Sequence, residues 1–284
     1  MKLGFVKRAP STMVMFCDES SQNLRQYVIG GVYFSPSDPE GGDVVVSRLE
    51  QQLTETKDRF ALEPGTLKWA KVPSDGQYLE GYKEFLTVFL EEKRFYFKCM
   101  VVDRSKYPLD SRAFMQKDPL LGYLKFYCVF LADGFLRRYP EHFFDVRIHQ
   151  YQDRPGHTVT DLERTVEARF VKRAQPPKRY LDYCRVRSMP LEGSNLLQLT
   201  DILVGAVAFV WNDGRERVSK RSNARRELVE LIESKRQMKL DQPTSAATLG
   251  INIWRFESSK LPQNSISSIT GRGMQDLARG DVKL

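Results

Sequence analysis

Residues 12–18 read TMVMFCD, a short apolar run that ends in an acid and is typical of a buried strand. A polar turn, ESSQNLR, follows it, and residues 26–35, QYVIGGVYFS, form a second β-rich run. Two such runs joined by a short polar turn predict a β-hairpin. We therefore expect the fold to begin with a pair of antiparallel strands.

Beyond the hairpin, helical and strand patterns alternate along the chain. The spacing of apolar residues predicts helices at 44–60, 79–92, 120–139, 159–173, 195–211 and 224–238, and strands at 95–102, 143–151, 179–187 and 249–256. An antiparallel start followed by strand–helix–strand units predicts an α/β fold, a mixed sheet flanked by helices.

Composition narrows the class of protein. The chain has 284 residues, of which 41% are hydrophobic and 28% charged, as in an ordinary globular domain. No apolar run reaches the roughly 18 residues of a membrane span, and the four cysteines lie too far apart for a cysteine-based zinc module or a disulfide framework. We expect a cytoplasmic protein without a membrane partner, folded over residues 1–257, with a weakly ordered tail at 258–284.

Three aspartates stand out because of their settings. Asp18 ends the first strand, Asp153 directly follows the strand predicted at 143–151, and Asp201 interrupts the apolar stretch SNLLQLTDILVGAVAFVW. A carboxylate in apolar surroundings destabilises a fold by several kcal/mol unless it is paired or bound to a metal. Each acid also has an ordinary explanation: Asp18 and Asp153 suit turns, and Asp201 suits a buried pair with an arginine.

The helix that carries Asp201 has one narrow polar stripe. Ser194, Gln198, Asp201 and Gly205 recur at spacings of four, three and four residues, which places them on one helical face. Gly205 has no side chain, so another part of the chain can approach closely there.

Several of these segments together resemble the domain of unknown function 3800 family, which is related in fold to ribonuclease H. They are FCDES followed by YVIGGVYF, the LKW segment at 67–69, and SNLLQLTDILVGAV followed by INIWRF, so the resemblance covers most of residues 13–256. The predicted element order also fits a ribonuclease H-like layout, provided that residues 37–92 are an insertion after the second strand.

The resemblance implies a nuclease-type site that holds Mg²⁺ or Mn²⁺. The family pattern would place the ligands at Asp18, Asp153 and Asp201, and Lys68 would contact the scissile phosphate or orient a carboxylate, although a solvated loop lysine is the ordinary alternative. Glu19 would join the catalytic residues only if the strand ended at Asp18, because in a continuing strand it faces away. Ribonuclease H proper also has a glutamate on the helix after the third strand. This chain offers only Asp118 and Asp133 near that position.

Charge favours a polyanionic partner. The chain has 44 Lys and Arg against 36 Asp and Glu, a net charge of +8. The first candidate surface for nucleic acid lies within residues 169–187 and rests on Lys172, Arg173, Lys178 and Arg179. A second basic stretch, 215–226, is the next candidate, and a solvated charged surface is the ordinary alternative for both.

These observations favour a divalent-metal-dependent phosphodiesterase, a nuclease that acts on nucleic acid through a water activated by carboxylate-bound Mg²⁺ or Mn²⁺. Two alternatives stay open. One is a non-catalytic nucleic-acid-binding or adaptor module that keeps the fold, and the other is a hydrolase of a small phosphorylated nucleotide. The sequence does not distinguish DNA from RNA, and it gives no indication of the oligomeric state or of a protein partner.

Overall fold

A computed structural model describes residues 12–21, 24–34, 42–62, 66–107, 126–136, 138–139, 142–149, 159–160, 162–164, 166, 184–245 and 250–257. The chain divides into two units, residues 1–254 and 255–284, and only 255–257 of the second unit are described. The predicted tail at 258–284 therefore lies outside the described residues. No helix among the described ranges combines the length and apolar character that a membrane crossing requires.

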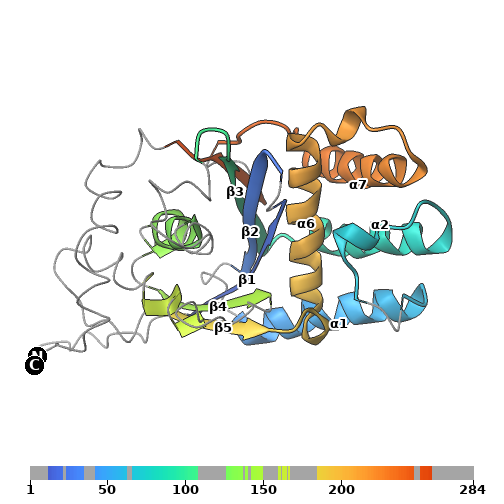
Figure 1. Cartoon of the computed structure of the whole chain (residues 1–284). Helices are drawn as coiled ribbons and strands as arrows, with labels where there is room; N and C mark the ends of the chain where they lie inside the picture. The colour runs from blue at the N-terminus through green and yellow to red at the C-terminus, as the bar shows by residue number, and fades with distance from the viewer. Residues whose placement is uncertain are drawn as a thin grey trace, which may run out of the picture. The chain divides into compact units, whose positions relative to one another are not determined.

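The sheet confirms the predicted α/β fold, and its layout is ribonuclease H-like (Figure 1). Its strands run in the order β5-β4-β1-β2-β3-β6. The first three strands are antiparallel neighbours, whereas β4 is parallel to β1 and β5 is parallel to β4. The strand bounds are Thr12–Ser20 (β1), Gln26–Phe34 (β2), Phe95–Asp103 (β3), Phe143–His149 (β4), Cys184–Met189 (β5) and Ile251–Arg255 (β6).

The predicted insertion contains two helices and a short 3-10 turn between β2 and β3. These are α1 (Gly42–Arg59), η1 (Trp69–Lys71) and α2 (Gly76–Glu91). After β5 come α6 (Asn195–Trp211) and α7 (Lys220–Arg236), close to their predicted ranges. On the other face of the sheet, residues 126–131 are helical and continue into a π-helical segment, η2 (Ala132–Leu136).

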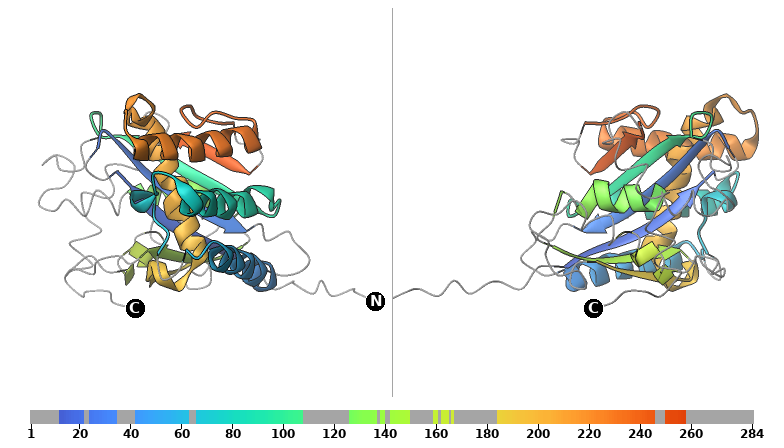
Figure 2. Two further views of the ribbon diagram at one scale, coloured as in Figure 1. Left: turned by 90° about the vertical axis from the view of Figure 1, so that its right-hand side faces the viewer. Right: turned by 60° about the vertical axis from the view of Figure 1, so that its left-hand side comes forward.

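Helix α6 lies between two layers of the molecule. One side contacts β1 and β2, and α1 and α7 contact it from elsewhere on its surface. Figures 1 and 2 show α1, α2 and α7 as an outer layer, with α6 between this layer and the sheet. This position explains why α6 is apolar on nearly every face, since a helix without a solvated side is apolar all round.

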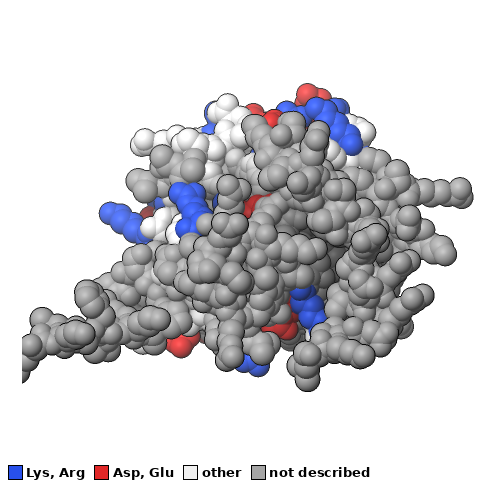
Figure 3. Space-filling view, turned by 90° about the vertical axis from the view of Figure 1, so that its left-hand side faces the viewer, with Lys and Arg blue, Asp and Glu red and all other residues white. Residues whose placement is uncertain are grey.

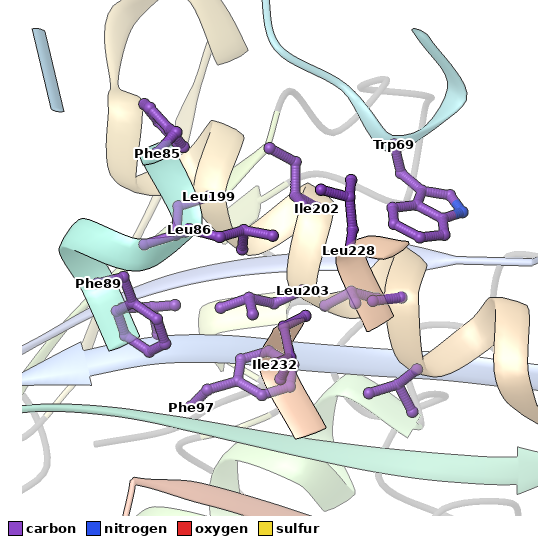
Figure 4. Close-up of a cluster of buried hydrophobic side chains, with 14 of the residues drawn as sticks. Trp69, Phe85, Leu86, Phe89, Phe97, Leu199, Ile202, Leu203, Leu228 and Ile232 are labelled. Atoms are coloured by element: carbon purple, nitrogen blue, oxygen red, sulfur yellow. The ribbon is translucent and has the colours of Figure 1, made fainter. Parts of the chain in front are cut away.

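Side chains from all three layers meet in one core (Figure 4). Leu199, Ile202 and Leu203 of α6 belong to the same buried cluster as Phe97 of β3 and Phe85 of α2. The close approach of α6 to the sheet depends on a glycine in β2. A Cβ added at Gly30 would lie 2.6 Å from the side chain of Val204.

The start of α6 is fixed by a carboxylate from α1. Ser194 caps the helix by accepting a hydrogen bond from the Leu197 N–H. The Glu50 side chain accepts hydrogen bonds from the Ser194 hydroxyl at 2.6 Å, from the Asn195 N–H at 2.9 Å and from the Leu196 N–H at 3.1 Å. A negative charge at a helix N-terminus is favourable, because the first N–H groups have no partner within the helix.

Replacing Glu50 with glutamine should lower the free energy of unfolding by about 1–2 kcal/mol, because an amide turns donors toward the helix N–H groups and removes the charge. Urea or thermal unfolding measures this change. The matched control is Glu55→Gln, an exposed residue of the same helix that accepts a bond from Gln51, and it should change stability by less than about 0.5 kcal/mol. Equal effects of the two substitutions would show that Glu50 does not anchor α6.

Candidate active site

Asp18 lies near the end of β1, on the face of the sheet that packs against α6. It pairs across the hairpin with Gly30, the residue opposite Val204 of α6. The Asp18 side chain is only 4% exposed. Its Oδ1 accepts a hydrogen bond from the Glu19 N–H at 2.9 Å, whereas its buried Oδ2 has no hydrogen-bond partner. A buried, unpartnered carboxylate oxygen destabilises a fold and indicates a place for a ligand.

The polar stripe of α6 binds the segment that contains the LKW sequence. Gln198 Oε1 accepts a hydrogen bond from the Leu67 N–H at 3.0 Å, and Asp201 Oδ2 accepts one from the Trp69 N–H at 2.5 Å. Gly205 leaves room for the Trp69 side chain, since a Cβ there would lie 2.2 Å from the indole. The stripe therefore positions this loop, and the partner of Asp201 is a backbone amide. Among the described residues, no arginine forms the buried pair that was the alternative for Asp201.

Asp18 and Asp201 lie close enough to affect each other electrostatically. Burial, together with the charge of Asp18, raises the pKa of Asp201 to about 7. The Trp69 N–H, His149 and Lys68 act in the opposite direction. The strand end and the helix thus bring two carboxylates to one place, where both being charged is unfavourable without a cation.

His149 ends β4 beside Asp18. Its Nδ1 lies 3.6 Å from Asp18 Oδ1, and the Asp18 carboxylate raises the pKa of the imidazole. The parallel register of β1 and β4 explains this position. Cys17 pairs with Ile148, so the residues that follow them, Asp18 and His149, are neighbours on the two strands. We did not predict His149 from the sequence. The sequence could have predicted this closeness, because Asp18 and His149 come near the ends of two strands that a ribonuclease H-like sheet places side by side.

Lys68 belongs to the same site. Its backbone is held by Tyr82, whose hydroxyl accepts a bond from the Lys68 N–H and donates one to the Lys68 carbonyl, both at 3.2 Å. The positive charge of Lys68 opposes the rise in the pKa of both Asp201 and His149. Lys68 is half-buried rather than a fully solvated loop residue.

Glu19 does not join this group. Strand β1 continues to Ser20, so Glu19 points to the opposite face from Asp18. There its carboxylate accepts a hydrogen bond from the Tyr127 hydroxyl. The condition for a catalytic Glu19, a strand that ends at Asp18, is therefore not met, and we correct that prediction.

Other predicted residues lie outside the described part of the chain. These are Asp153, Asp118 and the four basic residues Lys172, Arg173, Lys178 and Arg179. Asp133 is described and lies in η2. One further acid near the site, Glu192 between β5 and α6, was not predicted. Hydrogen bonds from its own backbone N–H and from the Thr66 hydroxyl lower its pKa. The charges of Lys68 and His149 act in the same direction.

The residues present fit a divalent cation that prefers oxygen ligands. Within the described ranges, no three His, Cys, Asp or Glu side chains form a preformed metal-binding group. Mg²⁺, however, often uses one or two protein carboxylates and completes its shell with water and substrate phosphate. Asp18, with a buried and unpartnered Oδ2, and Asp201, with a raised pKa, supply such a pair.

Comparisons with known proteins identify neither a family nor an activity for this chain. No protein-family model and no curated protein matches the chain. Among solved structures, a chain of the complex of PCNA with ribonuclease HII from Archaeoglobus fulgidus is similar, with 14% identity and a TM-score of 0.38, over 95% of this chain and 91% of that one. A likeness at this level says nothing about activity. The ribonuclease H-like assignment follows from the strand order and directions.

Asp201→Asn should make the metal-free protein more stable at neutral pH. Because the folded pKa of about 7 lies above the unfolded value of 3.8, the folded state binds more protons between these values, and the stability of the parent falls as pH rises through them. In EDTA at pH 8, the free energy of unfolding of the variant should be higher than that of the parent by about 1–3 kcal/mol. This difference should vanish near pH 4, where Asp201 no longer carries a charge in the folded parent.

Urea unfolding at several pH values measures the difference. Asp58→Asn, at an exposed acid on α1, is the control and should follow the parent at every pH. A variant of Asp201 that is less stable than the parent at pH 8 would contradict the electrostatic coupling of the two acids.

Proposed function

We propose that this protein is a divalent-metal-dependent phosphodiesterase that cleaves nucleic acid, and that it is a member of the domain of unknown function 3800 family. The observation that carries the proposal is the convergence of two carboxylates, Asp18 with a buried oxygen lacking a partner and Asp201 with a pKa raised by burial and by Asp18. They come from a strand end and a helix, two of the three places that the family pattern favours; the third, Asp153, lies outside the described residues.

The side chains at the site have distinct roles in this proposal. Asp18 and Asp201 would hold Mg²⁺ or Mn²⁺, and such an ion supplies activation of water and stabilisation of the departing oxygen. The Trp69 N–H fixes the orientation of Asp201. Lys68 would offset the negative charge of the scissile phosphate. The imidazole of His149, whose pKa Asp18 raises, would lie beside that carboxylate.

A nucleic-acid-binding module without catalysis is the second candidate. The small number of protein ligands for a metal favours it, since only two carboxylates converge among the residues that the structure describes. The two candidates differ in one measurable respect. Catalysis requires the charges of Asp18 and Asp201, whereas binding alone does not.

Asp18→Asn and Asp201→Asn should each lower cleavage by on the order of 100-fold or more, because an amide keeps the shape of the side chain but not the charge that holds the cation. The assay uses single- and double-stranded DNA and RNA with Mg²⁺, with Mn²⁺ and with EDTA. The parent should cleave at least one substrate with either metal and none in EDTA.

The control is again Asp58→Asn, which should cleave like the parent. Circular dichroism establishes that each variant is folded. A different result would be that the folded parent protein cleaves no substrate while the parent and both Asn variants bind nucleic acid with equal affinity. That result would replace the nuclease proposal with the non-catalytic binding module. If both Asn variants cleaved like the parent in Mg²⁺, the metal-nuclease proposal would be wrong.

A further inference from the structure

Three arginines gather at the start of α7, and no described carboxylate balances them. Arg221 and Arg225 are four residues apart and so lie on one face of the helix, and Arg217 precedes it. The Arg226 side chain binds the Arg217 carbonyl at 3.0 Å, which holds Arg217 beside the first turns of α7. Burial lowers the pKa of Arg225, and the charges of Arg221 and Arg217 lower it further. No acid in the described part of the chain forms an ion pair with any of them.

Two neighbouring arginines of the same stretch have side-chain partners, a carboxylate for Arg215 and an amide for Arg226. Arg215 forms an ion pair with the buried Glu233. Arg226 donates to the Asn223 side chain at 2.9 Å and to the Arg217 carbonyl at 3.0 Å. Like charges at this spacing repel and destabilise a helix. The uncompensated group of three therefore indicates a place where an anion would be favourable.

Arg225 is held in place rather than free in solvent. Its Nη2 donates to the carbonyls of Trp69 at 3.0 Å and Ala70 at 3.3 Å, and its guanidinium lies 5.4 Å from the centre of the indole of Trp69. Its Nε is buried and has no hydrogen-bond partner. A fixed cation loses little conformational entropy when it binds an anion.

A single residue connects this group to the candidate active site. The Trp69 N–H binds Asp201, and the Trp69 carbonyl binds Arg225. A strand of nucleic acid carries a phosphate about every 3.4 Å along the axis of a duplex, so a molecule cleaved at Asp201 has further phosphates within reach of the arginines. Arg217 and Arg221 are exposed, and Val218 between them is 93% exposed. Such a surface suits an extended strand better than a small enclosed ligand.

The opposite face of the molecule also carries described Lys and Arg side chains. Figure 3 views the molecule from the side of the sheet that lies away from α6. The described Lys and Arg side chains in that view lie in separate groups.

We propose that Arg217, Arg221 and Arg225 form a phosphate-binding site that holds the backbone of a nucleic-acid strand beside the Asp18–Asp201 pair. This inference rests on the proposed function for the identity of the ligand. Guanidinium groups suit it, because their planar donors bind phosphate oxygens in pairs.

The test measures binding with the Asp201→Asn chain, so that cleavage does not interfere. Fluorescence anisotropy of a labelled oligonucleotide, single-stranded and double-stranded in turn, gives the affinity at several salt concentrations. Adding Arg217→Gln and Arg221→Gln should reduce the slope of log affinity against log salt by about 0.7–0.9 for each phosphate that the protein no longer binds. Both residues are exposed, so the variant should fold, and its thermal unfolding establishes this.

The matched control carries Lys235→Gln and Lys239→Gln. These lysines lie at the other end of α7 and just beyond it, and they form ion pairs with Glu91 and Glu233. This variant loses the same charge and should keep the slope of its parent. An equal reduction in both variants would mean that only net charge matters, and it would overturn the site, as would an unchanged slope in the arginine variant.

The outcome for the site is separate from that for the proposed function. If the slope falls in the arginine variant while Asp18→Asn and Asp201→Asn still cleave, the phosphate site stands and the metal-nuclease proposal fails. If the Asn variants are inactive but the arginine variant binds with an unchanged slope, the metal-nuclease proposal stands and the phosphate site fails. Failure of the Asp201→Asn chain to bind any oligonucleotide would overturn the site.

Discussion

The burial of α6 is the constraint on which the rest of the structure depends. Because this helix is apolar on nearly all sides, it needs a layer on each side to exclude water. The sheet supplies one layer, and the inserted helices α1 and α2 together with α7 supply the other. The insertion after β2 is therefore part of the core rather than an appendage. It also brings the loop at 66–72 onto the polar stripe of α6, where it binds Gln198 and Asp201.

The same burial gives Asp201 its chemistry. In a solvated helix its pKa would stay near that of an ordinary carboxyl, but here desolvation and Asp18 raise it. The fold tolerates the carboxylate because the Trp69 N–H points at it, and Trp69 can approach because residue 205 is glycine. Thus the residues that allow close packing also determine the electrostatics of the site, and a change at Gly205 would affect both.

The sequence was sufficient for some of these features and insufficient for others. Helical and strand periodicity located the helices and strands that the structure describes, because burial on one face imposes a repeat that a single chain displays. The stripe through Ser194, Gln198, Asp201 and Gly205 was likewise visible. Its partner was not, because a backbone amide 132 residues away leaves no mark in composition. The role of Glu19 depended on whether β1 ended at residue 18 or 20, and strand ends are set by pairing with neighbours. His149 was overlooked because its closeness to Asp18 comes from the register of β4 on β1, a property of two segments and not of either alone.

The arrangement of charge bears on how a polyanion could approach two carboxylates. Asp18 and Asp201 alone would repel a phosphodiester by about 1–4 kcal/mol per charge pair at about 4 Å, for effective dielectric constants of about 80 to 20. Lys68 and His149 act against this repulsion at the pair itself, as their influence on the pKa of Asp201 indicates. Arg225 lies on the other side of Trp69, whose carbonyl it binds, and Arg217 and Arg221 are exposed near the start of α7. None of the three has a described carboxylate partner. In the proposed function, acids at the centre with cations around them would let one strand be attracted along its length while a single phosphate meets the carboxylates. Because Lys68 is half-buried whereas Arg217 and Arg221 are exposed, salt should weaken the attraction of the two arginines more than that of the lysine.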